Sequence, residues 1–212
     1  MSEYEIEPIR GLPGMLPPGE HIVWQGSPDW LTLARTAFST RLVTIYFVLL
    51  TGWALESAWA RHGGYLGVEM TAGLGLVGVA LLYALALAEA RTTVYTLTNR
   101  RIVLRIGIAV PKCINLPLRM IGAVDLALHR DGTGDVSLTI TGPAKLGVAA
   151  LWPHARPWKV IAPQPTLRAI PDAHAVADQI ARACRAVNPQ GSAVVTPTPA
   201  GRAPAFAEAA NA

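Results

Sequence analysis

Apolar side chains gather in two long runs near the middle of the chain, separated by a short polar segment. The first run, residues 42–60, carries Glu56 as its only charge, and the second, residues 70–88, carries none. A helix needs about 20 apolar residues to cross a bilayer core of about 30 Å, and both runs meet that length. We predict a transmembrane helical hairpin over residues 41–90. The alternative, a buried helical pair in a soluble core, requires more surrounding chain than 212 residues provide.

After Thr92 the apolar residues recur with a period of two, which is typical of strands. Strands are predicted at 92–98, 101–107, 112–116, 123–129 and 135–141, with one or two more within 158–170. The linker between 123–129 and 135–141 contains an Asp-Gly pair, a signal for a tight hairpin. Pro171 and Asp172 then begin a helix that ends at Asn188 and carries an apolar face of Val176, Ile180, Ala183, Cys184 and Val187. Five to seven antiparallel strands followed by one helix, residues 91–188, match the plan of a PH-like β-barrel.

The two ends of the chain have a different character. Residues 1–40 begin as a proline-rich arm, followed by a short strand at 21–26 and an amphipathic helix at 30–40, which we place at the membrane interface. Residues 189–212 are rich in Pro and Ala and are predicted to be disordered. The predicted fold class is therefore an α+β membrane protein, with a two-helix hairpin followed by a cytoplasmic antiparallel barrel and a C-terminal helix.

Composition supports a chain that is partly in a membrane, because 51% of its residues are hydrophobic and only 15% are charged. The charges are unevenly divided. Residues 1–40 hold two Arg against five Asp and Glu, a net charge of −3, whereas residues 92–187 hold twelve Lys and Arg against five Asp, a net charge of +7. A basic domain tethered to a membrane fits anionic lipid headgroups or an acidic partner surface. The opposite charges of the arm and the domain also favour docking of the 21–26 strand on the barrel. No nucleic acid is expected, since no helix-turn-helix, zinc-finger or basic–aromatic signature accompanies the charge.

The distribution of Lys and Arg also predicts the topology of the hairpin. Arg35 and Arg41 precede the first helix, a group of arginines follows the second, and the connecting loop 61–69 holds Arg61 alone. We therefore predict that both termini are cytoplasmic and that the 61–69 loop is periplasmic. The arginines that follow the second helix are predicted to contact a partner: Arg100, Arg101 and Arg105.

Two features inside the hairpin have alternative interpretations. Glu56 is a functional candidate because acidic residues are rare in membrane helices, but the favoured interpretation is a snorkelling or locally hydrated carboxylate neutralised by Arg61. The second helix carries small residues at Gly73, Gly75, Gly78, Ala80, Ala84 and Ala88. Small residues allow close approach of helices in lipid, so this stripe serves the hairpin itself, a homodimer or a partner's helix.

No motif for catalysis, nucleotide binding or metal binding occurs in the sequence. The two cysteines, Cys113 and Cys184, have no metal-ligand spacing and are expected to be reduced in the cytoplasm. The five histidines all lie outside the predicted membrane helices, so the hairpin offers no obvious axial ligand for a chlorin pigment. We therefore predict a non-enzyme without a cofactor.

The segment 151–159 is the densest unusual cluster in the chain, with Trp152, His154, Arg156 and Trp158 set between prolines. Trp and Arg are enriched at binding hot spots, so a loop that binds a partner or a lipid headgroup is one hypothesis. The other is a structured loop whose tryptophans pack onto the barrel.

Six segments carry a resemblance to a known family. They are EPIRGLPG (7–14), PPGEHIVWQGSPDW (17–30), LTNRRIVLRIGIAVPKCINLPL (97–118), HRDGTG (129–134), WPHARPW (152–158) and QPTLRAIPDAHAVA (164–177). In these the chain resembles the PuhB family, assembly proteins for the photosynthetic reaction centre of purple bacteria. The LTNRR element recurs in many membrane-anchored bacterial PH-like proteins, but together with the tryptophan-containing segments it is specific.

The resemblance implies an inner-membrane protein with a cytoplasmic PH-like domain, and self-association as a dimer. It also implies a role in assembling the reaction centre and, through it, the core light-harvesting complex. From residues and resemblance together we expect a non-catalytic assembly factor that contacts reaction-centre subunits. The rival hypothesis is a membrane-anchored module that binds anionic lipid headgroups or scaffolds another membrane complex.

Overall fold

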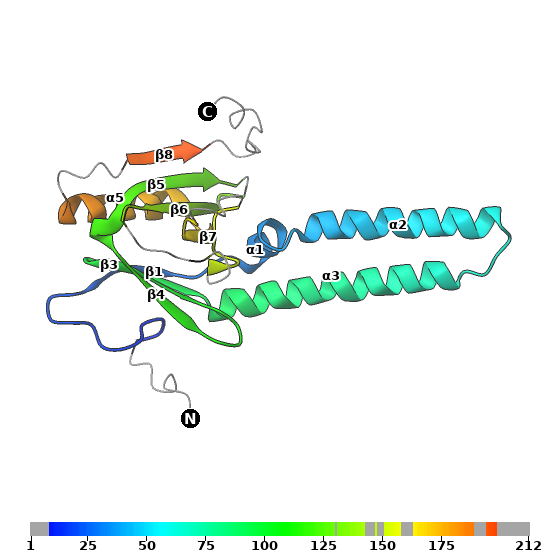
Figure 1. Ribbon diagram of the computed structural model, residues 1–212, viewed down its shortest axis with the longest axis horizontal. Coiled ribbons are helices and arrows are strands. Elements are labelled where there is room, and N and C mark those ends of the chain that lie inside the picture. The colour runs from blue at the N-terminus through cyan, green and yellow to red at the C-terminus, as the bar shows by residue number, and fades with distance from the viewer. Residues whose placement is uncertain are drawn as a thin grey trace.

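The computed structural model describes residues 9–129, 131–142, 147, 151–157, 163–188 and 194–198. Two long antiparallel helices project from one end of a domain built of two sheets and a helix (Figure 1). The hairpin and the domain are the two parts predicted from the sequence. Trp158 lies outside the described residues, as does most of the C-terminal tail.

The hairpin consists of α2 (Thr40–Ala60) and α3 (Leu66–Thr92), both long and apolar enough to cross a membrane. Helix α3 begins earlier than predicted, inside the segment assigned to the connecting loop. The carbonyl of Tyr65 accepts hydrogen bonds from the N–H groups of Val68 and Glu69, which closes the first turn. Glu69 in that turn also suits the positive end of the helix dipole.

The first sheet has the order β1-β2-β3-β4, and all its neighbours are antiparallel. Its strands are β1 (Ile22–Gly26), β2 (Val94–Thr98), β3 (Arg101–Ile106) and β4 (Lys112–Pro117). Strand β1 comes from the N-terminal arm and pairs with β2, which follows the hairpin. The arm is thus part of the domain, and a fragment beginning at residue 91 would lack an edge strand.

The second sheet has the order β7-β6-β5-β8. Its strands are β5 (Ile121–Leu128), β6 (Gly134–Ile140), β7 (Thr166–Ile170) and β8 (Val194–Thr198). Strand β8 pairs with β5 in parallel, so the prediction of a disordered tail needs correction for these five residues.

The expectation of a closed barrel is wrong for the described residues, where each sheet keeps two edges and no ladder joins the two sheets. The path between β4 and β5 is interrupted by Pro117 and a 3-10 turn, η1 (Leu118–Met120). The helical backbone of η1 ends the extended chain, so β4 and β5 are separate strands rather than one strand that bends from one sheet into the other.

Helix α5 (Ala173–Val187) places Val176, Ile180 and Cys184 in the core with residues of both sheets, as the apolar spacing predicted. Val187, predicted for the same face, is 42% exposed at the last turn. The short helix α1 (Trp30–Thr36) ends before the predicted residue 40, and Ser39, with φ 51°, separates it from α2.

Candidate functional site

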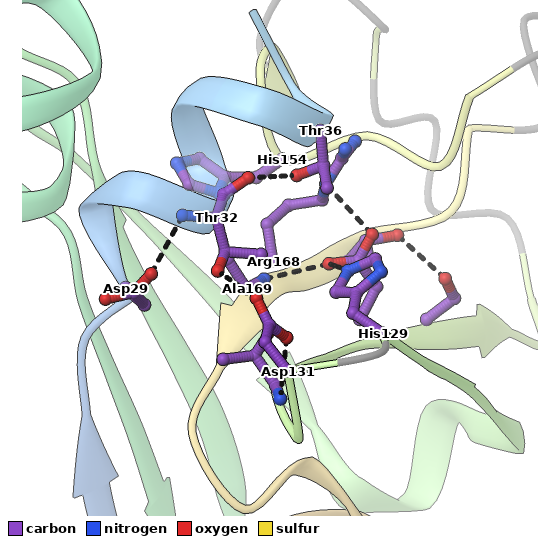
Figure 2. Close-up of polar contacts among 12 residues, drawn as sticks. Asp29, Thr32, Thr36, His129, Asp131, His154, Arg168 and Ala169 are labelled. Atoms are coloured by element: carbon purple, nitrogen blue, oxygen red, sulfur yellow. Dashed lines mark hydrogen bonds and ion pairs between the residues drawn. The ribbon is translucent and has the colours of Figure 1, made fainter. Parts of the chain in front are cut away.

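Five polar or charged side chains, each less than a tenth exposed, are buried where α3 enters the domain. They are Glu89 at the end of α3, Thr93, Tyr95 on β2, His154 in the 151–157 loop, and Arg168 on β7. We call them the junction cluster, because they join the hairpin to both sheets. Figure 2 shows His154 and Arg168 beside α1. A buried polar cluster of this kind must satisfy its hydrogen bonds internally.

The imidazole of His154 bridges two groups from different elements. Its Nε2 lies 3.0 Å from Oε1 of Glu89, and its Nδ1 lies 2.7 Å from the hydroxyl of Tyr95. The backbone N–H of Arg168 donates to the same hydroxyl at 3.2 Å. One tautomer satisfies every group: Nε2–H donates to Glu89, and Nδ1 accepts the Tyr95 proton. The hydrogen bonds among Glu89, His154 and Tyr95 are therefore complete with a neutral imidazole.

Burial is the main influence on the pKa values of His154 and Tyr95. It lowers the pKa of His154, although the adjacent Glu89 carboxylate opposes the shift. Burial also raises the pKa of Tyr95 far above its usual value. Both groups therefore hold fixed protonation states near neutral pH, which suits a structural junction rather than proton transfer.

A second set of charges continues from Arg168 along β6 toward α1. Nε of Arg168 and Nε2 of His129 lie 3.2 and 3.3 Å from the two carboxylate oxygens of Asp135, within ion-pair distance but outside hydrogen-bond geometry. Burial opposes ionisation of Asp135, but these two partners and the backbone N–H of Ala169 outweigh it and hold the pKa of the carboxyl below its usual value. The contact with Asp135 raises the pKa of His129.

Helix α1 is attached to the second sheet by two hydrogen bonds, one to the turn between β5 and β6 and one to β7 (Figure 2). The Thr32 hydroxyl donates to Asp131 at 2.9 Å, in the turn between β5 and β6. The backbone N–H of Asp29 donates to the carbonyl of Ala169 on β7 at 2.7 Å. The lead-in to the hairpin is thus held by the second sheet, as the end of α3 is held by the junction cluster.

The structure distributes the predicted loop residues between surface and interior. Trp152 is 62% exposed and packs edge-on against Phe38, with ring centroids 5.7 Å apart. His154 is fully buried, and Arg156 pairs with Asp125 and donates to Gln164. Packing onto the domain therefore accounts for His154 and Arg156, whereas Trp152, of the predicted residues that the structure describes, remains at the surface of the loop.

The three predicted arginines also have different surroundings. Arg101 forms an ion pair with Glu20 at 2.8 Å, which ties the N-terminal arm to the first sheet, and Arg105 donates to the carbonyl of Thr92 at 3.3 Å. Burial tends to raise the pKa of Glu20, but its hydrogen bonds with Arg101 and Thr98 lower it overall. Arg100 is exposed. Because β2 leads away from the hairpin, Arg100 and Arg101 lie at the end of the sheet remote from α3 (Figure 1).

Of the small-residue stripe of α3, Gly75 forms the hairpin contact. The close approach to α2 is at Gly75, where a Cβ would lie 2.8 Å from Cβ of Phe47. Gly73, Ala80 and Ala84 are exposed, and Gly78 and Ala88 are half-buried. Glu56 on α2 is also exposed. Of the alternatives for the stripe, contact with a second copy or a partner helix remains open for its exposed members.

Within the described residues, no three His, Cys, Asp or Glu side chains come together as metal ligands. Cys184 lies in the core, where burial raises the pKa of its thiol to about 11.

Sequence reasoning identified His154 but missed the rest of the junction cluster. Glu89 immediately follows the second apolar run, and β2 (VYTLT) is buried at every position although two of its residues are threonines. A polar residue at the end of a long apolar helix, next to a strand that is buried although it contains threonines, is the signal that could have pointed to the cluster.

Comparisons with known proteins agree with this architecture. A model of the bacterial PH domain family matches residues 45–183, from within α2 to within α5. An uncharacterised 23.7 kDa protein of Rhodobacter capsulatus, described as lying in the puhA 5′ region, is 37% identical over 211 residues, which cover 97% of this chain and 98% of the relative. No solved structure matches the chain.

Proposed function

Because the chain belongs to the bacterial PH domain family, we propose that it is a membrane-anchored, non-catalytic assembly factor of the PuhB type, acting on the photosynthetic reaction centre and core light-harvesting complex. The observation that carries the proposal is the near-full-length relative described by its place in the puhA 5′ region, a position consistent with a photosynthesis gene cluster. The resemblance of segments such as WPHARPW and GSPDW to the PuhB family supports it.

Membrane insertion of α2 and α3 is part of the proposal. Large apolar side chains such as Leu49, Trp59 and Leu76 are more than two-thirds exposed on the hairpin, which a soluble monomer would not present to water. Arg41 and Arg91 lie at the end joined to the domain, whereas the distal loop holds Arg61. The bias of positive charge supports a cytoplasmic domain with both termini on that side of an inner membrane.

The junction cluster supports a structural role for the domain rather than catalysis. His154 is sealed from solvent and its hydrogen bonds are all used within the chain, so no substrate reaches it. The cluster and the α1 contacts hold the domain at a defined orientation to the hairpin. An assembly factor built this way presents a helix face and a cytoplasmic surface to the same immature subunit at once. The surfaces left for that subunit, or for a second copy, include the exposed face of Gly73, Ala80 and Ala84.

The proposal is tested in Rhodobacter capsulatus by deleting the gene of the relative and supplying this chain in its place. We expect the deletion to lower reaction-centre content in membranes while pigment synthesis continues, and this chain to restore it. Absorbance spectra and quantification of reaction-centre subunits provide the measurement. Normal reaction-centre content in the deletion strain contradicts the proposal.

A variant pair makes the test specific for the helix surface. Gly73→Leu changes the exposed face of α3 at a position where an added Cβ meets no atom within 4 Å. The protein should therefore accumulate normally but restore less reaction centre. Gly52→Leu, on α2 and equally open, is the matched control and should restore fully. Affinity purification of each variant from solubilised membranes identifies the partner that is lost.

The rival function, selective binding of lipid headgroups, is favoured by the net charge of +7 in residues 92–187. Because β1 completes the domain, the full chain is the proper sample. Native mass spectrometry of the detergent-purified chain with anionic or zwitterionic lipid separates the two ideas. Selective retention of one headgroup at about 0.5 M salt supports the rival, since salt of that strength screens a general attraction.

A further inference from the structure

We propose that the loop between β3 and β4, residues 107–111, inserts into the bilayer interface beside the hairpin and is a second membrane contact of the domain. The inference rests on the proposed insertion of α2 and α3. It assigns contact with lipid to a surface segment of the domain. Anchoring by the hairpin alone does not require this contact.

The strand register places this loop next to the end of α3. Strand β2 begins just after α3, and Val94 pairs with Arg105 near the end of β3. The Arg105 guanidinium donates to the carbonyl of Thr92, the last residue of the helix. At about 3.3 Å per residue, three further residues carry the chain about 10 Å beyond Arg105, back along the last turns of α3. Figure 1 shows the loop turning toward the side from which the hairpin projects.

The side chains of this loop are unusual for a solvent-facing turn. Its sequence, GIAVP, has no polar or charged side chain. Ile108 is 42% exposed and Val110 is 68% exposed. Hairpin loops in water normally carry Asn, Asp, Ser or Gly, which hydrogen-bond locally, whereas exposed aliphatic side chains gain free energy by leaving water.

The loop has a compact shape that holds these side chains outward. Gly107 has φ +108°, and a Cβ at this position would lie 2.5 Å from the carbonyl oxygen of Val110. Only glycine permits this close approach of the two ends of the loop. Pro111 further restricts the backbone, so little conformational freedom remains to be lost on insertion.

Exposed cations surround the apolar tip at the same end of the domain. Lys112 follows the loop directly, and Arg91 lies in the last turn of α3. An apolar tip flanked by cations suits an anionic leaflet, in which the side chains enter the acyl boundary and the cations meet headgroups. Trp152 packs against Phe38, which lies between α1 and α2, and tryptophan favours the same interfacial depth. Continuity with the hairpin selects the bilayer, rather than a protein, as the occupant.

The test uses the full chain in vesicles containing anionic phospholipid, labelled at single cysteines with an environment-sensitive fluorophore. The background carries Cys113→Ser, and the buried Cys184 resists labelling under native conditions. Val110→Cys reports the loop. Val187→Cys is the matched control, since this exposed valine ends α5 at the end of the domain remote from the hairpin. Leu76→Cys reports the exposed surface of α3.

We expect a blue-shifted emission at position 110 and strong quenching by lipids with a shallow nitroxide, with neither effect at position 187. Quenching at 76 together with a label at 110 that behaves like the one at 187 overturns this inference and leaves membrane insertion of the hairpin intact. Absence of quenching at 76 overturns the insertion of the hairpin itself, and this inference with it. Ile108→Ser in the Val110→Cys protein should weaken the quenching at 110 and increase its quenching by aqueous iodide, whereas no change from Ile108→Ser contradicts insertion.

Discussion

His154 lies between a carboxylate and a phenol that share its two ring nitrogens, and no water is needed to complete their hydrogen bonds. Each hydrogen bond of this kind adds only about 0.5–1.5 kcal/mol to the net stability, because the unfolded chain bonds to water instead. The larger effect appears when one member is removed. The remaining buried groups then lose their partners and bear the full cost of desolvation.

Replacement of Tyr95 by Phe tests this at a single oxygen atom. We expect a loss of about 1–3 kcal/mol in the free energy of unfolding, because Nδ1 of His154 and the N–H of Arg168 are left buried without a partner. The measurement is thermal or denaturant unfolding of the detergent-purified chain. Tyr65→Phe, in the exposed hairpin loop, is the matched control and should change stability by less than about 0.5 kcal/mol. Equal stability of the two variants would show that the cluster is not a stabilising junction.

At the scale of elements, the hairpin depends on one close contact between its helices. The closest approach recorded at a glycine of α3 is that of Gly75 to the base of the Phe47 side chain on α2. Because the neighbour is Cβ of Phe47, a rotamer change cannot relieve a clash there. The β1–β2 pairing is the corresponding contact of the N-terminal arm, fixed by the Arg101–Glu20 ion pair beside it.

Gly75→Leu should therefore force α2 and α3 apart and destabilise the hairpin by about 1–3 kcal/mol, as overpacking of a fitted interface does. Fluorescence energy transfer between labels on α2 and α3, together with thermal stability in detergent, measures the change. Gly73→Leu adds the same side chain two residues away, where an added Cβ meets no atom within 4 Å. This variant should leave the energy transfer and the thermal stability unchanged. A hairpin equally stable in both variants would contradict the packing described here.

At the scale of the whole molecule, the buried charges link hairpin, arm and both sheets into one unit whose stability depends on pH. Two histidines, the buried His154 and the half-buried His129, act in opposite directions. The pKa of His154 is lowered by burial, so its contribution is present above the unfolded pKa of about 6.5 and is lost as the pH falls below it. The pKa of His129 is raised by Asp135, so its contribution is complete below about 6.5 and is lost as the pH rises through the raised folded value.

Acidification from about pH 7.5 to about pH 5.5 should therefore change the unfolding free energy differently in two variants. His154→Gln removes the group whose contribution to stability is lost in acid. On acidification its free energy of unfolding should therefore fall less, or rise more, than that of the wild type. His129→Gln removes the group whose contribution to stability is gained in acid. On acidification its free energy of unfolding should fall more, or rise less, than that of the wild type. Denaturant unfolding of the three proteins at both pH values gives the order, and a reversed order contradicts the assigned protonation states.

Local patterns determined much of this molecule. Apolar runs of sufficient length predicted α2 and α3, and alternation predicted β2, β3, β5 and β6 close to their observed bounds. The opposite charges of the arm and the domain also indicated that residues 21–26 dock onto the sheet, as β1 does. These features follow from the sequence because burial along one helix or strand depends on residues that are near neighbours in the chain.

Only the tertiary structure decided which polar residues became interior. Glu89, Tyr95, His154 and Arg168 come from four separate segments, and their burial is favourable only because each supplies the hydrogen bond that another needs. The division of the described strands into two open sheets and the position of β8 likewise depend on pairings between distant segments. Local patterns in the sequence specify a hairpin and a PH-like set of strands. The junction between them, and the apolar loop that the strand register brings beside α3, exist because long-range packing places these groups together, which no local pattern specifies.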